Sequence, residues 1–386
     1  MVVTGLDQIQ RALPTVLGSG AVGLITNHSA VDTDLRAAAD VLAKRVDLVR
    51  LFGPEHGIRG REQAGESVDD SVDEPTGIPV TSLYGETRRP PADQLAELDV
   101  LVYDIQGVGV RYYTYLYTLA YAIEAAADAA IPIVVLDRPN PIAPLEIVGN
   151  RIPAGENSFV GGYELPVVHG MTVGEFASYV AGEFVPSADV RVVELTGWYR
   201  DQWFEATGLP WVPPSPNMPT VDTARWYPGT CLFEGTNCSE GRGTTLPFEQ
   251  IGAPWIDPHE LAAAITDLDL PGVGIRPTYF TPQFHKHDGE SCGGVQVHVR
   301  DLDSFAPLHA GIALLATIMT TYPNAEWRGG PGGFGIDRLA GGSTLRSRID
   351  ALSGPAGVSG LLADLERDWR ADVRTFRDDR APYLRY

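Results

Sequence analysis

Residues 100–137 read VLVYDIQGVGVRYYTYLYTLAYAIEAAADAAIPIVVLD, and they decide the fold class. The stretch begins with the apolar run 100–106 and ends with a second apolar run, 131–137. Between them, residues 115–130 repeat apolar side chains at helical spacing. Two short apolar strands joined by a helix are typical of a parallel sheet that is buried on both faces.

The same pattern extends toward the N-terminus. Short apolar runs occur at 21–27, 46–53 and 78–84, and residues 35–45 are rich in alanine and leucine. Strands that alternate with helices predict a doubly wound, Rossmann-like sheet. The sequence therefore predicts an α/β domain over residues 1–160.

From residue 161 the chain becomes richer in glycine, proline and aromatic residues. Long ordered loops, which are usually functional in compact domains, are predicted at 212–220, 227–248 and 280–294. Residues 295–299 alternate like a strand, and 308–320 and 358–376 have helical patterns. We expect a smaller α+β domain over residues 161–386, with a cleft between the two domains.

Composition narrows the class of partner. The chain of 386 residues carries 29 basic and 50 acidic residues, a net charge of −21. Nucleic acids and anionic membranes both require a basic surface, so neither is an expected partner. No apolar stretch is long enough to span a membrane.

Cysteine usage and the start of the chain bear on location. Three cysteines are too few for a disulfide framework, and the first residues lack the basic and apolar regions of a secretory signal. A cytoplasmic protein is expected, although a mature exported form would have the same features.

Polar residues follow most of the predicted strands. They are Asn27 after the first, Glu55 and His56 after the second, Asp104 and Gln106 after the fourth, and Arg138 and Asn140 after the fifth. In open α/β sheets, ligands bind beyond the carboxyl ends of the strands. These side chains are therefore candidates for an active-site rim.

Glu55, in the sequence GPEHG, is the sharpest catalytic candidate. Pro54 and Gly57 predict a turn that holds its carboxyl in the crevice, where partial burial favours a general acid. A glutamate in such a turn can also cap a helix or form an ion pair, which is the structural alternative.

The segment after the fourth strand combines several groups used in sugar recognition. Arg111, Tyr112 and Tyr115 follow Asp104 closely, and polar groups with aromatic faces suit a sugar ring and its hydroxyls. The alternative is that the aspartate caps the next helix while the tyrosines pack.

A second group of candidates lies in the predicted loops of the second half. Glu234 and Glu240 are candidates for the second carboxylate of a glycosidase, and Arg242 for a partner of a substrate carboxylate. Asn217 and Asn237 are further candidates for binding substrate. The alternative is a solvated loop in which glutamate and arginine pair with each other.

No cofactor or metal is expected. The first strand is not followed by GxGxxG, and neither GxxxxGK[ST] nor GxSxG occurs. His285, His287 and Cys292 lack the spacing of a known metal site, so packing roles are favoured for them.

The chain resembles the NamZ-type exo-β-N-acetylmuramidases along nearly its whole length. The resemblance rests on GLITNHSAVD, LFGPEHGIRG, DVLVYDIQGVGVRYYTY, VVLDRPNPI, SPNMPT, YPGTCLFEGTNCSEGRGTTLPFEQIGAPW and the terminal RAPYLRY. It implies a Rossmann-like domain beside a smaller one, and hydrolysis of non-reducing-end β-linked N-acetylmuramic acid in peptidoglycan turnover and recycling. It also implies a catalytic role for Glu55. Two positions depart from the family pattern: Gly107 stands where DIQDVG has aspartate, and Val148 precedes Gly149-Asn150.

The mechanism stays open at one step. Glu55 is expected to protonate the glycosidic oxygen, and the second group is either a carboxylate (Asp104, Glu234 or Glu240) or the acetamido oxygen of the substrate. Arg111 or Arg242 is expected to pair with the lactyl carboxylate. The rival interpretation is a sugar or muropeptide binding protein that needs no acid. The sequence gives no oligomeric state.

Overall fold

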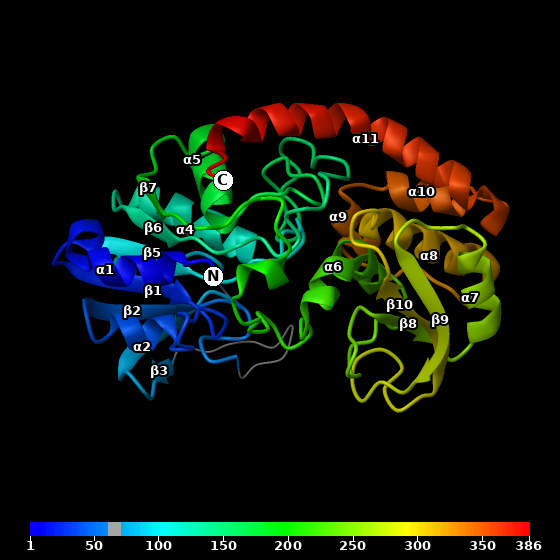
Figure 1. Ribbon diagram of the computed structural model, residues 1–386, viewed down its shortest axis with the longest axis horizontal. Helices are drawn as coiled ribbons and strands as arrows, with labels where there is room; N and C mark the ends of the chain where they lie inside the picture. Colours follow the sequence, from blue (N-terminus) through cyan, green and yellow to red (C-terminus); the bar gives the residue numbers. More distant parts are fainter. Residues whose placement is uncertain (61–70, 86) are drawn as a thin grey trace.

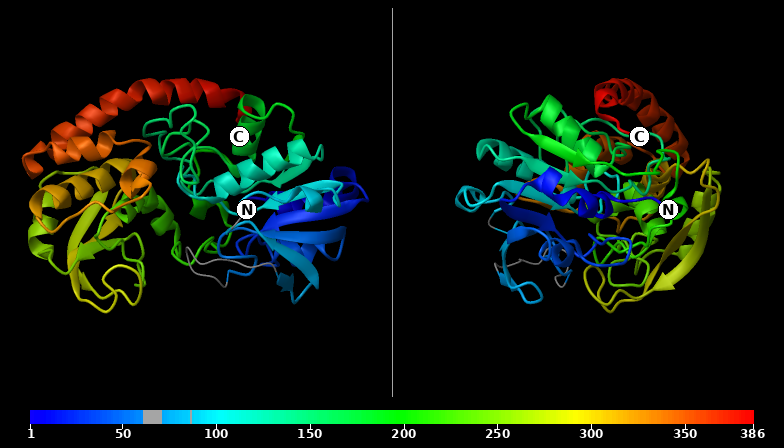
Figure 2. Two further views of the ribbon diagram at one scale, coloured as in Figure 1. Left: turned by 180° about the vertical axis from the view of Figure 1, so that it is seen from behind. Right: turned by 60° about the vertical axis from the view of Figure 1, so that its left-hand side comes forward.

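The computed structural model describes residues 1–60, 71–85 and 87–386. It has two lobes, each built around a β-sheet, and helix α11 (Val358–Arg380) arches across both of them (Figures 1 and 2). Within the described residues, no helix is long and apolar enough to cross a membrane.

The first lobe contains a seven-stranded sheet with the order β3-β4-β2-β1-β5-β6-β7. Only β3 runs antiparallel to its neighbour. The strands are β1 (Ala21–Thr26), β2 (Asp47–Gly53), β3 (Ser71–Asp73), β4 (Ile78–Ser82), β5 (Val100–Asp104), β6 (Ile133–Leu136) and β7 (Val190–Val193).

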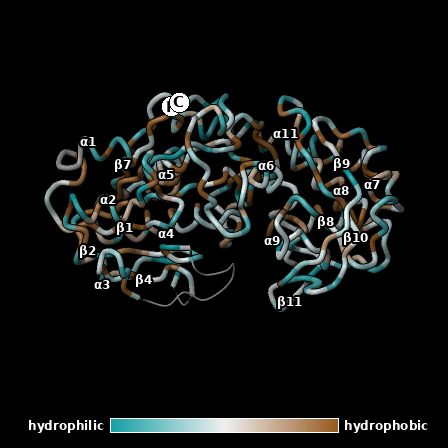
Figure 3. The backbone as a smooth tube through the Cα atoms, turned by 60° about the horizontal axis from the view of Figure 1, so that its bottom comes forward, coloured by the Kyte–Doolittle hydropathy of each residue, from teal (hydrophilic) through white to brown (hydrophobic). Residues whose placement is uncertain are grey.

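Burial on both faces explains why the central strands are continuously apolar. Along β5, Val100 and Val102 join the core on one face, while Leu101 and Tyr103 join the core on the other. Successive side chains of a strand point to opposite faces, so a strand covered by helices on both sides has no polar face. Figure 3 shows hydrophobic segments concentrated in the interior of each lobe.

The first-lobe helices are α1 (Gly5–Leu17), α2 (Ala38–Leu42), α3 (Ala92–Leu95), α4 (Tyr115–Asp128) and α5 (Val173–Glu183). Two of them begin at capping boxes. Thr4 and Asp7 cap α1, and Thr172 and Glu175 cap α5. Each pair satisfies backbone N–H groups that the first helical turn leaves without partners.

The predicted α/β fold is confirmed, and five predicted strands correspond to β1, β2, β4, β5 and β6. The predicted helix at 115–130 corresponds to α4. The short edge strands β3 and β7 were not predicted, because β3 has three residues and the residues of β7 are only partly buried.

The second lobe is built on the antiparallel sheet β8-β10-β9, with a two-stranded ribbon beside it. Its strands are β8 (Gln250–Ala253), β9 (Val273–Phe280), β10 (Cys292–Val299), β11 (Gly329–Gly330) and β12 (Gly333–Phe334). Its helices, apart from α11, are α6 (Val221–Thr230), α7 (Pro258–Thr266), α8 (Pro307–Thr321), α9 (Gly335–Ala340) and α10 (Thr344–Asp350).

The predictions for this lobe were partly right. The strand expected at 295–299 lies in β10, and the two expected helices correspond to α8 and α11. The stretch 227–248 was wrongly predicted to be loop throughout, because α6 continues to Thr230 and a 3-10 helix, η2 (Cys231–Gly235), follows it. Prolines and glycines in this stretch hide the helices from a pattern based on apolar spacing.

Helices α6 and α8 approach each other through two glycines. A methyl group built on Gly311 would lie 2.3 Å from the Cα atom of Gly229. Real carbon atoms do not approach so closely, so a side chain here would force the two helices apart.

We expect Gly311→Ala to destabilise the protein by roughly 1–3 kcal/mol, because it overpacks this contact. Gly360→Ala is the matched control, since nothing lies within 4 Å of its added methyl group and it should stabilise α11 by up to about 1 kcal/mol. Urea denaturation of both variants measures the difference. Equal midpoints for the two would show that the glycine contact does not limit packing.

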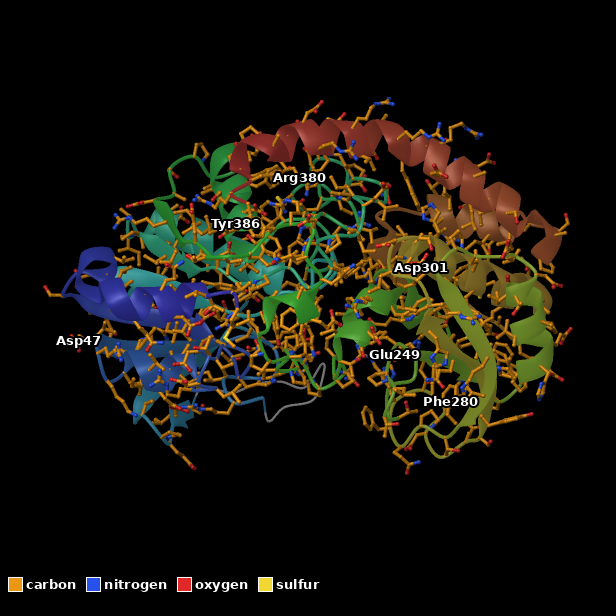
Figure 4. All side chains as sticks on the ribbon, in the orientation of Figure 1. Asp47, Glu249, Phe280, Asp301, Arg380 and Tyr386 are labelled. Carbon is orange, nitrogen blue, oxygen red and sulfur yellow. The ribbon has the colours of Figure 1, made fainter. Side chains whose placement is uncertain are left out.

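The C-terminal residues return to the first lobe. Arg380 donates hydrogen bonds to the carbonyl groups of His169 and Gly170, each at 2.8 Å. The hydroxyl of Tyr386 donates to the buried carboxylate of Asp137 at 2.8 Å. Figure 4 labels Arg380 and Tyr386 on this side of the molecule. Because α11 also packs on α8, the C-terminal segment fastens one lobe to the other.

The division into domains stays a proposal. Strand β7 pairs with β6, and α5 packs on both, although all of α5 and β7 lies beyond residue 160. This pairing favours a boundary later than the one expected at residue 160.

Candidate active site

A cavity of about 440 Å³ is lined by residues from both lobes. Its carboxylates are Glu55 and Glu234, its arginines are Arg88, Arg242 and Arg338, and its tyrosines are Tyr84, Tyr112, Tyr113, Tyr115 and Tyr227. Its volume falls in the range of small-ligand sites, roughly 300–1,000 Å³. Carboxyl groups beside several aromatic faces and cations suit a charged sugar.

Glu55 lies directly beyond β2, at the carboxyl edge of the first sheet. Its turn closes with a hydrogen bond of 2.9 Å from the Gly57 amide to the Pro54 carbonyl. The hydroxyl of Thr114 donates to the Glu55 carboxylate at 3.2 Å. The predicted turn therefore places this carboxylate at the cavity, half-buried, with a fixed partner.

The residue after Glu55 has an unusual backbone. His56 has a φ of 71°, in the left-handed region that residues other than glycine rarely adopt. Its side chain is buried and lines the cavity. Strain of this kind persists where the surroundings hold it, and it is concentrated at functional sites.

Tyr115 and Asn27 hold the cavity wall from behind. The Tyr115 hydroxyl donates to the Pro214 carbonyl at 2.8 Å and lies 3.3 Å from the Glu55 carbonyl. The Asn27 side-chain amide donates to that same hydroxyl at 3.0 Å. Tyr115 lines the cavity and Asn27 does not, so Asn27 fixes the wall instead of facing a ligand. The adjoining loop brings Asn217 to the cavity, as expected.

On the second lobe, Glu234 and Arg242 form an ion pair of 2.7 Å. Arg242 also lies 3.2 Å from Glu240, which accepts a hydrogen bond of 2.8 Å from Lys286. Burial alone would raise the pKa of Glu240, but Lys286, His285 and Arg242 hold it well below its usual range. Glu240 is fully buried behind Arg242, so only Glu234 faces the cavity.

Aromatic rings connect the two ends of the site. Tyr115 packs edge-on against Tyr113, Tyr113 against Tyr227, and Tyr227 against Phe248, with ring centroids 4.9–5.8 Å apart. The guanidinium of Arg242 lies 5.0 Å from the centre of the Phe248 ring. This row of rings crosses from the first lobe to the second and offers apolar faces to a sugar.

Asp104 does not line the cavity. Its carboxylate is fully buried and receives two hydrogen bonds from Arg138, at 2.5 and 2.9 Å. Burial raises the pKa of Asp104, and the charge of Arg138 opposes that shift. The aspartate and the arginine each satisfy the other inside the protein, away from the cavity.

Four other expected binding residues also lie outside the cavity lining. Gln106 donates to the carbonyl groups of Gly107 and Pro139, and Asn140 to that of Met171. Arg111 is fully buried and donates to three backbone carbonyls. Asn237 bonds the backbone of residues 324 and 326. Their polar groups stabilise loops, and Gly107, the departure from the family pattern, does not line the cavity either.

Several lining residues were missed by sequence analysis, among them Arg88, Phe159, Ser215 and Arg338. They come from segments far apart in the chain, and none of them follows a predicted strand directly. Tyr84 offered a signal, because it follows β4 closely, as Glu55 follows β2.

The histidine and cysteine candidates have ordinary protein partners. His285 lies 3.3 Å from Glu240, and His287 bonds the Asn237 carbonyl at 2.8 Å. In the described part of the chain, no cluster of three or more His, Cys, Asp or Glu residues could hold a metal ion. Cys231 lines the cavity, but burial raises its pKa well above the usual value, which disfavours a thiolate nucleophile.

Comparison with known proteins identifies relatives over the whole chain. Two family models match, described as the N-terminal and C-terminal parts of the exo-β-N-acetylmuramidase NamZ, over residues 22–222 and 225–386. The peptidoglycan β-N-acetylmuramidase NamZ of Bacillus subtilis (strain 168) is 45% identical over 387 residues, covering 100% of this chain and 91% of that protein.

Solved structures agree with this assignment. Two DUF1343 family proteins of Bacteroides fragilis NCTC 9343 superpose with TM-scores of 0.88 and 0.77, at 35% and 29% identity. Each comparison covers 100% of this chain and 99% of the other. With both family models matched and a full-length relative at 45% identity, the chain belongs to the NamZ family of exo-β-N-acetylmuramidases.

Proposed function

We propose that the protein is a glycoside hydrolase that releases β-linked N-acetylmuramic acid from the non-reducing ends of peptidoglycan fragments. The observation that carries the proposal is the Glu55 carboxylate, which lies at a tyrosine-lined cavity and receives a hydrogen bond from Thr114. The name of the Bacillus subtilis relative supports the same substrate. Family membership favours this enzyme over a sugar or muropeptide binding protein.

Glu55 is the proposed general acid. It protonates the glycosidic oxygen as the bond to the anomeric carbon breaks, and positive charge develops on the sugar ring. Water completes the hydrolysis at the anomeric carbon.

Two groups can stabilise that positive charge. Glu234 is the other carboxylate at the cavity, whereas Asp104 and Glu240 are buried in ion pairs away from it. The alternative is the acetamido oxygen of the substrate, which other enzymes use on 2-acetamido sugars.

The cavity volume supports an exo mode. About 440 Å³ suits one substituted sugar better than a long stretch of glycan. His56, Tyr112 and Asn217 line the same space and are proposed to contact the bound sugar.

We also propose a cytoplasmic location. All three cysteines are buried and unpaired, which is usual for a protein that works in a reducing compartment. No nucleic acid, membrane or cofactor enters the proposal.

We expect the purified protein to release p-nitrophenol from its β-N-acetylmuramic acid glycoside and not from the β-N-acetylglucosamine glycoside. The two substrates differ only in the lactyl ether, so the pair tests activity and specificity together. A well-folded protein that hydrolyses neither would overturn the proposed function.

A further inference from the structure

The inference concerns recognition of the lactyl carboxylate, and it rests on the proposed function. This carboxylate distinguishes N-acetylmuramic acid from N-acetylglucosamine. The protein has a net charge of −21, so an anionic sugar binds only where a local cation faces the cavity.

Neither arginine expected from the sequence is available for this role. Arg111 is buried outside the cavity lining, and its terminal nitrogens donate to the carbonyl groups of Asn150, Leu165 and Leu339. Arg242 faces the cavity, but Glu234 and Glu240 already neutralise it.

Two other arginines line the cavity, and neither forms an ion pair within the described parts of the chain. They are Arg88 on the first lobe and Arg338 on α9 of the second lobe (Figure 1). Arg338 is exposed, and its guanidinium donates to the Gly332 carbonyl at 3.2 Å. It has no aromatic partner to hold it in one orientation, whereas Arg88 does.

The guanidinium of Arg88 lies 3.9 Å from the centre of the Phe159 ring. Phe159 is itself packed among Tyr84, Tyr117 and Tyr121, with centroids 6.2–6.3 Å away. Stacking fixes the flat face of a guanidinium and leaves the N–H groups at its edge free. Those groups match a carboxylate in a bidentate pair.

Arg88 also lies on the same side of the cavity as the proposed acid. Burial raises the pKa of Tyr84, the charge of Glu55 raises it further, and the charge of Arg88 opposes them. Tyr84 therefore lies within reach of both charges. The acid must meet the oxygen on C1 of the sugar while the cation meets the substituent on C3, so the two must be separated by about the width of one sugar ring.

We propose that Arg88, stacked on Phe159, binds the lactyl carboxylate and gives the site its specificity for N-acetylmuramic acid. Arg242 instead orients Glu234. This assignment replaces the roles expected for Arg111 and Arg242.

The test compares inhibition by N-acetylmuramic acid, by its methyl ester and by N-acetylglucosamine. We expect Arg88→Ala to weaken inhibition by the free acid about 10- to 100-fold, because a charge-assisted bidentate pair is lost. Inhibition by the uncharged ester and by N-acetylglucosamine should change less than threefold or so, within the scatter for an exposed side chain. Arg88→Lys should fall between wild type and Arg88→Ala, because a lysine keeps the charge without the planar fork.

Arg89→Ala is the matched control, since Arg89 is the neighbouring exposed arginine, pairs with Asp128 and does not line the cavity. It should leave all three inhibition constants unchanged. An Arg88→Ala protein that weakens acid and ester equally, or a selective loss in Arg338→Ala instead, would overturn the assignment.

The outcome is separable from failure of the proposed function. If wild type hydrolyses the muramic acid glycoside and Arg88→Ala keeps its preference for the acid over the ester, only the Arg88 assignment is wrong. If wild type hydrolyses no glycoside but binds the acid through Arg88, the proposed hydrolysis is wrong and the recognition site stands.

Discussion

Glu55→Gln should lower kcat/KM for the β-N-acetylmuramic acid glycoside by about 10²- to 10⁴-fold, the usual contribution of a general acid. The amide has nearly the same shape as the carboxyl and still accepts the hydrogen bond from Thr114. It cannot donate a proton that leaves a stable anion behind. Binding of N-acetylmuramic acid should therefore stay near the wild-type level, as isothermal titration calorimetry would show.

Glu97→Gln is the control for this change, because Glu97 is an exposed glutamate that pairs with Arg50 on the first lobe, away from the cavity lining. It should keep full activity. Turnover by Glu55→Gln within tenfold of wild type would remove Glu55 from the mechanism.

Glu234→Gln then separates the two candidates for the second group. A loss of similar size would favour the carboxylate, and a small loss would favour the acetamido oxygen of the substrate.

Asp104→Asn should destabilise the fold by roughly 3–5 kcal/mol, because it leaves the charge of Arg138 buried without its partner. Both side chains are buried, and their two hydrogen bonds are 2.5 and 2.9 Å long. Urea denaturation would measure the loss, and kcat of the molecules that remain folded should be close to wild type.

The double variant Asp104→Asn/Arg138→Met is the matched control. It removes the unpaired charge, so it should be more stable than Asp104→Asn alone. A stable Asp104→Asn protein without activity would instead return Asp104 to the catalytic candidates.

The sequence predicted the first lobe well because each central strand is buried on both faces and separated from the next by a helix. Glu55 was predictable for a related reason: it directly follows β2, and the carboxyl ends of parallel strands meet at one edge. The same reasoning failed for Asp104 and Arg138. Both follow strands, but they pair with each other inside the protein, and a sequence does not show which polar residues satisfy one another.

The far side of the cavity was only partly predictable. Glu234 and Arg242 could be proposed from their loop, but Arg338 arrives from α9, almost a hundred residues later. Arg88 and Phe159 meet across a similar separation on the first lobe. Such contacts depend on how helices and loops pack, and local periodicity holds no information about them.

The C-terminal attachment has a consequence for synthesis in the cell. Asp137 and its partner Tyr386 are 249 residues apart, so the ribosome needs on the order of ten to fifty seconds to make the residues between them. During that time the corner of the sheet around Asp137 lacks its last hydrogen-bond donor. The lobe that is translated first is therefore the one that is completed last, and a nascent chain stalled before residue 380 would present this corner to chaperones and proteases.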